Sequence, residues 1–205
     1  MKKQKPVIIE GYNNEWPRAF NIIESVISNK LNSLALRIEH VGSTSIPSLS
    51  AKPIIDIDVV IESMNCLPQV IRNLEELGYI YEGDLGIKNR EAFARKDVYV
   101  PYTSEGNEKH EHHLYVYNRE SEELKRHIMF RDILRKHPLL VTEYANLKFQ
   151  LANKYRNNRQ AYTAGKTEFI KRIMNEYQDI KVYFRKNEAS DNKVSTLQAV
   201  RPLIC

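Results

Sequence analysis

The sequence has little of what marks disulfide-stapled, low-complexity or membrane-spanning chains. Its 205 residues include two cysteines, Cys66 and Cys205, and only seven glycines. Two cysteines this far apart form no disulfide framework, so we expect a reducing, cytoplasmic setting. No apolar run reaches the roughly 18 residues that a membrane helix needs, and no apolar signal-peptide core follows the basic residues 1–6. We therefore expect neither a membrane span nor secretion by the usual route.

What is present is typical of a globular domain. The chain is 42% hydrophobic and 28% charged, with a formal net charge of +5. That charge is unevenly divided: residues 1–118 hold 13 basic and 16 acidic side chains, whereas residues 119–186 hold 16 and 8. A net charge of −3 therefore precedes one of +8. The basic part is either a solvated helical face or a wall that faces an anion, such as phosphate or nucleic acid.

The hydrophobic period predicts an α+β fold with a mixed sheet and flanking helices. Helical spacing covers residues 16–34, 67–77, 120–136, 139–157 and 159–177, and β-branched or alternating runs predict strands at 37–41, 54–61, 79–82, 91–100 and 112–117. Residues 101–111 are polar and predict a loop. We expect an α/β core at residues 1–118, a basic helical cap packed on it at 119–186, and a disordered tail at 187–205.

Asp56 and Asp58 are the most specific feature. Alternate residues of a strand point to the same side, so both carboxylates face one way while Ile55, Ile57 and Val59 face the other. Two like charges so close raise one another's pKa unless a cation lies between them. Mg²⁺ commonly uses one or two carboxylates plus substrate phosphates. The pair therefore predicts a site for Mg²⁺ or Mn²⁺, or else a strand end where both carboxylates reach water or a lysine.

A turn of small polar residues precedes this strand. Gly42 allows close approach of the backbone, and the Ser43 and Ser45 hydroxyls can contact phosphates. The order Gly42-Ser43, twelve residues, then Asp56-Ile57-Asp58 resembles the signature of the nucleotidyltransferase superfamily. That resemblance implies that the turn contacts a nucleoside triphosphate and that the two carboxylates hold Mg²⁺ for in-line attack on the α-phosphate.

A closer resemblance, to the GrpB-like family, covers nearly all of residues 7–177. The stretches that carry it are residues 38–47 (IEHVGSTSIP), 51–57 (AKPIIDI), 113–116 (HLYV), 130–135 (FRDILR), 144–148 (YANLK) and 162–166 (YTAGK). The family is placed in the nucleotidyltransferase fold, but its substrate and reaction are not established. The resemblance implies that Arg131, Lys148, Tyr162 and Lys166 form the walls of one cleft.

His113 stands where the superfamily usually supplies a third carboxylate. The strand expected at residues 112–117 contains no acid, and His113 takes that place. Imidazole binds Mn²⁺ or Zn²⁺ but suits Mg²⁺ poorly. His113 is therefore either a metal ligand or an acid–base group in a reaction with altered chemistry. Otherwise, its presence indicates that catalysis has been lost and that a binding site remains. A hydrogen-bonded structural histidine is the third alternative.

The basic helices repeat one spacing, in which a lysine follows a tyrosine by four residues. Tyr144 and Lys148 form one such pair, and Tyr162 and Lys166 form another. This spacing puts a ring and an ammonium side by side on one helical face. Such faces either meet a phosphate or a base, or are surface lysines packed over tyrosines. Lys52, just before the aspartate strand, is a further candidate phosphate contact.

These observations lead to one function and two alternatives. The leading hypothesis is metal-dependent transfer of a nucleotidyl group from a nucleoside triphosphate to an unknown acceptor, with Asp56, Asp58 and His113 as the catalytic groups. The first alternative is a nucleotide-binding or regulatory module without catalysis. The second, less favoured, is a nucleic-acid-binding protein whose basic half tracks a phosphate backbone.

Overall fold

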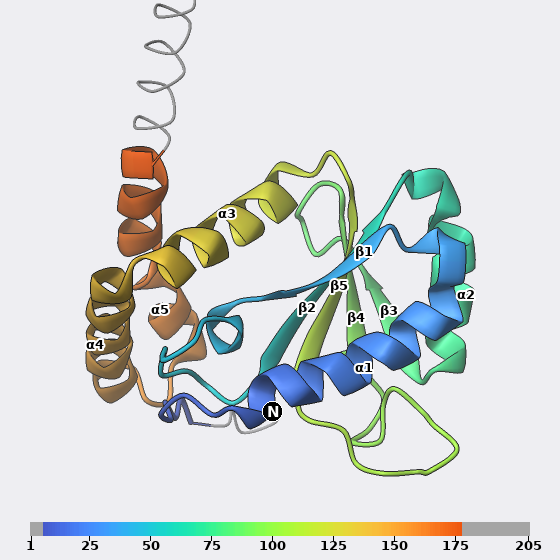
Figure 1. The fold of residues 1–205 in the computed structure, drawn as a ribbon, viewed down its shortest axis with the longest axis horizontal. Coiled ribbons are helices and arrows are strands. Elements are labelled where there is room, and N and C mark those ends of the chain that lie inside the picture. Colours follow the sequence, from blue (N-terminus) through green and yellow to red (C-terminus); the bar gives the residue numbers. More distant parts are fainter. Residues whose placement is uncertain (1–5, 178–205) are drawn as a thin grey trace, which may run out of the picture. The chain divides into compact units, whose positions relative to one another are not determined.

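The computed structural model describes residues 6–177. The chain divides into two compact units after Lys166, and each is described by itself. The first unit holds a sheet with flanking helices (Figure 1), and residues 167–177 of the second are helical. The expected division at residue 118 falls within the first unit and stays a prediction. The tail expected at 187–205 lies outside the described residues.

The sheet has five strands. They are β1 (Arg37–Val41), β2 (Ile55–Ile61), β3 (Tyr79–Gly83), β4 (Arg90–Arg95) and β5 (His112–Asn118). Their order across the sheet is β1-β2-β5-β4-β3. The central strands β2 and β5 run parallel, and every other neighbouring pair is antiparallel. The sheet is therefore mixed, and the predicted α+β class is confirmed.

Five helices of the first unit accompany the sheet. They are α1 (Glu15–Leu31), α2 (Leu67–Glu76), α3 (Glu122–Lys136), α4 (Pro138–Lys154) and α5 (Arg159–Ala164). Short 3-10 turns cover Asn32–Leu34, Ser43–Ser45 and Met64–Cys66. The Ser121 side chain accepts from the Leu124 N–H and caps α3, and Pro138 opens α4, where its missing N–H has no helical partner to lose.

The two faces of the sheet carry different chemistry. One face is the main core, in which β2 residues such as Ile57 and Val59 pack with Ile23 and Ile27 of α1 and Leu74 of α2. The opposite face carries Asp56 and Asp58, as strand alternation predicts. There α3 covers only part of the sheet, where Leu124 packs on Val60 and Tyr117. The polar face is thus left open beside α3.

Several of the predicted elements, including the following three, are shorter than expected. The strand predicted at 91–100 ends at Arg95, because the Asp97 carboxylate accepts the Tyr99 N–H and turns the chain. The helix predicted at 16–34 gives way to a 3-10 turn after Leu31. The helix predicted at 159–177 is interrupted at Gly165 and Lys166. Local periodicity extended all three predictions too far. Among residues 6–177, no helix combines the length and apolarity that crossing a membrane requires.

Candidate functional site

The site begins at the tight turn between β1 and the 3-10 turn Ser43–Ser45. Gly42 has φ +68° and ψ −172°, a conformation that is almost restricted to glycine. A Cβ placed on Gly42 would lie 2.1 Å from Asp56 Oδ2, so the turn packs directly against this carboxylate. The Ser45 hydroxyl donates to the Gly42 carbonyl at 2.7 Å. Gly42 and Ser45 therefore shape the turn, while Ser43 lines the adjoining pocket.

Replacing this glycine should test how tightly the turn fits. We expect Gly42→Ala to lower the free energy of unfolding by about 2 kcal/mol or more, because alanine adds backbone strain of about 1–3 kcal/mol and also a steric clash. Urea unfolding measures the loss. Gly106→Ala is the matched control, since Gly106 has φ +62° but nothing within 4 Å of a new Cβ. If both variants lose the same free energy of unfolding, the close contact with Asp56 contributes nothing to the effect of Gly42→Ala.

Asp56 is hydrogen-bonded to the predicted His113. The parallel pairing of β2 and β5 sets these two residues side by side, and His113 Nδ1 lies 2.9 Å from Asp56 Oδ1. On its other side His113 Nε2 lies 3.2 Å from an Arg159 guanidinium nitrogen. Arginine can only donate, so Nε2 accepts and the proton of the neutral imidazole is on Nδ1, facing Asp56. Burial is the largest single influence on Asp56 and opposes its ionisation, but the bond to His113 together with the nearby charges of Lys166 and His127 outweighs it and lowers the carboxyl pKa.

Asp58 has its own histidine partner, which comes from α3. The Asp58 side chain is 0% exposed, and its Oδ2 lies 2.7 Å from His127 Nδ1. The second ring nitrogen of His127 lies 3.6 Å from Glu123 Oε1. Burial alone would lower the pKa of His127, but the carboxylates of Asp58 and Glu123, which accept from its ring nitrogens and attract its positive charge, raise the pKa to about 10. Burial also raises the pKa of Asp58, against the His127 bond. The pair therefore keeps a shared proton at neutral pH.

Each carboxylate keeps one oxygen outside these histidine bonds. Asp58 Oδ1 is buried without a hydrogen-bond partner, and Asp56 Oδ2 lies on the Gly42 side. Two free carboxylate oxygens fit a Mg²⁺ or Mn²⁺ ion that would complete its shell with phosphate and water. Across residues 6–177, however, no group of three or more His, Cys, Asp and Glu side chains is placed to hold a metal. A cation here would therefore depend on ligands from a substrate.

A cationic pocket adjoins Asp56 and His113. We call it the lysine pocket; it has a volume of about 190 Å³ and is lined by Ser43, Lys52, Ile54, Asp56, His113, Lys148, Arg159, Tyr162, Thr163 and Lys166. Seven of these ten were predicted from the sequence. Within the part of the chain that the structure describes, none of its four cations forms an ion pair with a carboxylate within 4.0 Å. The pocket therefore holds uncompensated positive charge.

The tyrosine–lysine spacing accounts for the walls of this pocket. Lys148 Nζ lies 4.8 Å from the centre of the Tyr144 ring, and Lys166 Nζ lies 5.0 Å from that of Tyr162. Lys148 also donates to the Ser50 carbonyl. Burial, with neighbouring cations, lowers the pKa of Lys148 to about 7 and that of Lys52 to about 8. Burial likewise lowers the pKa of Lys166. An anion would relieve this mutual repulsion.

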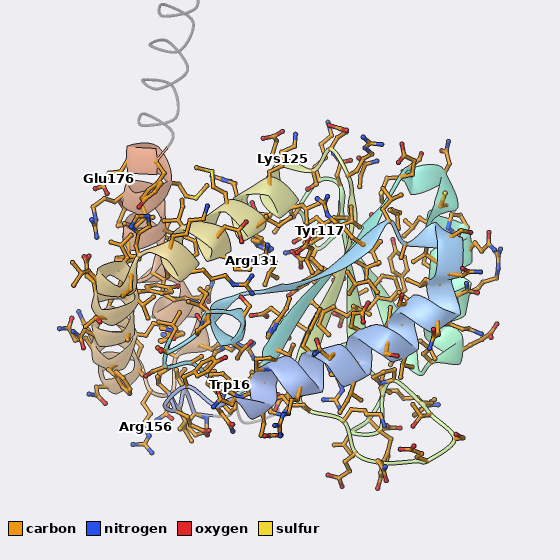
Figure 2. All side chains as sticks on the ribbon, viewed as in Figure 1. Trp16, Tyr117, Lys125, Arg131, Arg156 and Glu176 are labelled. Atoms are coloured by element: carbon orange, nitrogen blue, oxygen red, sulfur yellow. The ribbon has the colours of Figure 1, made fainter. Side chains whose placement is uncertain are left out.

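Arg131 is placed elsewhere than the sequence suggested. It points from α3 toward β1 (Figure 2), where it donates to Glu39 Oε2 at 2.6 Å and to the His40 carbonyl at 3.1 Å. It also bonds the carboxylate of Asp132 at 2.8 Å. Arg131 does not line the lysine pocket; it joins α3 to β1 and so holds the helix that carries His127.

Sequence reasoning missed three residues of the site: Glu123, His127 and Arg159. A signal existed for two of them, because Glu123 and His127 continue the i, i+4 row of Arg131 along α3. That row faces the sheet, which brings His127 to Asp58. Arg159 stands at the start of α5, and its approach to His113 could not be read from spacing.

Comparison with known proteins finds relatives of similar sequence. The UPF0157 protein YqkA of Bacillus subtilis is 34% identical over 170 residues, which are 83% of this chain and 46% of YqkA. The glutamate-rich protein GrpB of Alkalihalophilus pseudofirmus is 34% identical over 171 residues, 83% of this chain and 95% of that protein. The chain thus spans about half of YqkA and nearly all of the second relative.

A solved structure agrees with these relatives. The crystal structure of conserved protein GrpB from Enterococcus faecalis aligns with a TM-score of 0.72 and 32% identity, covering 86% of this chain and 99% of that one. A structure of the Cid1 poly(U) polymerase also aligns, with 12% identity and a TM-score of 0.43, over 77% of this chain and 50% of that one. The family profile described as GrpB protein matches residues 6–176. The chain therefore belongs to the GrpB family.

Proposed function

We propose that the chain binds a nucleoside triphosphate with Mg²⁺ or Mn²⁺ and transfers its nucleotidyl group to an acceptor. The observation that carries the proposal is the lysine pocket, whose unpaired cations Lys52, Lys148, Arg159 and Lys166 surround a space next to Asp56. A polyphosphate supplies the negative charge that these groups lack, and proteins usually hold one by bidentate arginine contacts and by the point charges of lysines. The proposed reaction takes place in the cytoplasm.

In the proposed step, the aspartates and the lysine pocket have different roles. The acceptor hydroxyl forms an oxygen–phosphorus bond to the α-phosphate, the α–β phosphoanhydride bond breaks, and pyrophosphate leaves into the lysine pocket. The hydroxyl proton is released to water. Asp56 and Asp58 would hold the cation, which supplies charge neutralisation and orientation. His113 keeps Asp56 ionised and oriented, because it donates to Oδ1 and leaves Oδ2 free.

Thermal denaturation with nucleotides tests the binding part of this proposal. A ligand at a hundred times its Kd stabilises the folded state by about 2.7 kcal/mol, which raises the Tm of a chain of this size by roughly 5–10 °C. We expect that rise with a triphosphate and Mg²⁺ or Mn²⁺. Lys166→Gln should remove most of it, whereas Lys125→Gln on the exposed side of α3 should leave it unchanged.

The role of the carboxylates needs a separate comparison. Asp56→Asn should abolish the difference between the Tm measured with nucleotide plus metal and that with nucleotide plus EDTA, because the amide is a poor cation ligand. If no nucleotide–metal pair raises the Tm of the unaltered protein, the proposal is wrong. If Asp56→Asn keeps the metal-dependent increment, Asp56 is not a metal ligand.

The second candidate function is a nucleotide-binding module without catalysis. It is favoured by the histidine bond on each carboxylate and by the lack of a third metal ligand within residues 6–177. The two functions differ in turnover: only the first releases pyrophosphate. A pyrophosphate-release assay with candidate acceptors, run on a protein that passes the Tm test, separates them.

A further inference from the structure

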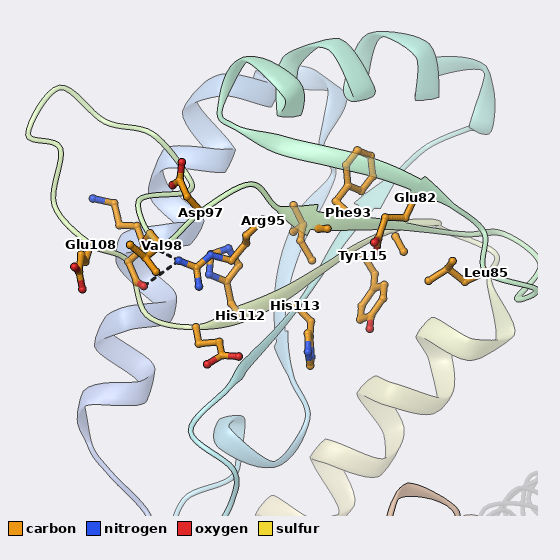
Figure 3. Close-up of a pocket in the computed structure, with 15 residues that line it drawn as sticks. Glu82, Leu85, Phe93, Arg95, Asp97, Val98, Glu108, His112, His113 and Tyr115 are labelled. Carbon is orange, nitrogen blue, oxygen red and sulfur yellow. Dashed lines mark hydrogen bonds between the residues drawn. The ribbon is translucent and has the colours of Figure 1, made fainter. Parts of the chain in front are cut away.

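A second and larger pocket lies on the same face of the sheet. We call it the β4–β5 pocket; its volume is about 480 Å³. Its floor is formed by small side chains, Ala92 and Ala94 of β4, which leave space beside Tyr115 of β5. One wall is the segment after β4, which is held in place because Arg95 donates to the carbonyls of Val98 and Lys109 at 2.7 and 3.2 Å (Figure 3).

The two pockets meet at His113, which lines both. His113 and Tyr115 point into the β4–β5 pocket from alternate positions on β5 (Figure 3). Asp56 is bonded to His113 at 2.9 Å and lines the lysine pocket on the other side. A phosphate held at Asp56 would therefore have the lysine pocket on one side and the β4–β5 pocket on the other. In-line transfer requires this arrangement, with the leaving group and the nucleophile on opposite sides.

The charges of the two pockets are opposite. The lysine pocket has four cations against one carboxylate, whereas the β4–β5 pocket has four carboxylates against two cations. Both of those cations are engaged: Arg95 binds two carbonyls, and Lys109 Nζ donates to Thr103 at 3.1 Å. Glu82 and Glu108 make no ion pair within the described residues. The second pocket therefore attracts positive charge and repels phosphate.

The walls of the β4–β5 pocket are poorly suited to a nucleobase. The Arg90 guanidinium lies 4.9 Å from the centre of the Tyr115 ring, and the His113 and Tyr117 rings each lie 6.4 Å from it. Phe93 is 4% exposed and belongs to the core on the other face. The Arg90 guanidinium thus lies over the Tyr115 ring, and of the other lining rings Phe93 and His112 are buried. A flexible molecule bearing ammonium groups makes better use of this pocket than a base does.

We propose that the β4–β5 pocket is the acceptor site and that it takes a small amine-bearing acceptor, whose ammonium groups lie near Glu82 and Glu108. This inference rests on the proposed function, because it names the acceptor of that reaction. The reacting hydroxyl reaches the phosphate past His113, and the ammonium groups remain at the acidic rim. Leu85 and Val98, which also line the pocket, contact the carbon chain of the acceptor.

Binding of simple probes tests the site without requiring turnover. We use 1,8-diaminooctane as the cationic probe, suberate as a probe of the same length with opposite charge, and adenosine as the nucleoside probe. Calorimetric titration should show that the diamine binds and that suberate and adenosine do not. Ala94→Leu fills the floor and should abolish binding. Glu82→Lys should weaken it by about fivefold or more, because one attraction becomes a repulsion.

Two further variants separate this proposal from the proposed function. Glu75→Lys makes the same charge change on the exposed side of α2, behind the sheet, and should leave diamine binding unchanged. Lys166→Gln should remove the nucleotide-dependent Tm rise and keep diamine binding. If the unaltered protein binds the diamine but no nucleotide–metal pair raises its Tm, the result counts against the proposed function and not against the cation site in the β4–β5 pocket. Equal binding of suberate, Ala94-dependent binding of adenosine, or diamine binding that survives Ala94→Leu would overturn the acceptor site.

Discussion

His127→Ala is expected to lower the free energy of unfolding by about 3–5 kcal/mol at neutral pH, because it leaves the fully buried Asp58 carboxylate without its only hydrogen-bond partner within the described residues. His127 supplies both a hydrogen bond and a positive charge at 2.7 Å from Asp58 Oδ2. The other carboxylate oxygen has no partner already. Chemical denaturation at pH 7 measures the effect, which should be among the largest that any single substitution on α3 produces.

If the unpaired Asp58 carboxylate causes this loss of stability, removing its charge should restore the stability. In the variant, burial raises the pKa of Asp58 above its ordinary value of 3.8, so the folded state binds a proton more tightly than the unfolded state does. Stability then falls as pH rises, and the deficit of His127→Ala should be small near pH 4 and complete at pH 7. Adding Asp58→Asn should recover most of the loss. A deficit independent of pH and of Asp58→Asn would mean that lost packing, not the buried charge, destabilises the variant.

An exposed ion pair provides the comparison. Arg119 contacts Glu62 at 2.8 Å, but both side chains are more than half exposed. Arg119→Ala should leave stability almost unchanged, because water solvates each charge once the pair is broken. The contrast between the two variants depends on burial rather than on distance, since the two contacts are nearly equally short.

The local parts of the site could be predicted from the sequence, since they follow from the periods of strand and helix. Period two puts Asp56 and Asp58 on one face, and a four-residue step puts Lys148 beside Tyr144. The distant contacts could not be predicted. Asp56 meets His113 only because β2 and β5 are parallel in one particular register, and no local pattern encodes that register.

Arg131 and the end of β4 show where local patterns mislead. Arg131 lies four residues before Arg135, on the same helical face, and the family resemblance implies that it forms a cleft wall, yet Glu39 of β1 neutralises it at 2.6 Å. Residues 98–100 are as strand-like in composition as Phe93, but one carboxylate–amide bond at Asp97 ends the strand. In both cases a single tertiary or turn contact outweighs the propensity of the segment.

The affinity for a nucleoside triphosphate should fall steeply with pH, by roughly a hundredfold between pH 7.5 and 9. The pKa of Lys148 is lowered to about 7 and that of Lys52 to about 8, so without a ligand Lys148 is already mostly deprotonated at pH 7.5 and Lys52 loses most of its protons across this range. The triphosphate binds the protonated forms and must therefore draw protons back into the lysine pocket. At a pH above the pKa of a lysine, that lysine reduces the affinity by at most about tenfold for each further pH unit. Calorimetric titration at several pH values measures the slope.

Lys52→Arg tests the source of this slope. Arginine keeps its proton throughout the range, so the variant should lose the part of the pH dependence that Lys52 supplies and keep the part from Lys148. Lys136→Arg, on an exposed position of α3, should keep the full slope. The number of protons taken up on binding, obtained from titrations in buffers of different ionisation enthalpy, should fall in Lys52→Arg but not in Lys136→Arg. Affinity that stays constant from pH 7.5 to 9 would show that the triphosphate does not depend on these two lysines, because an anion held by buried ammonium groups must lose affinity as they deprotonate.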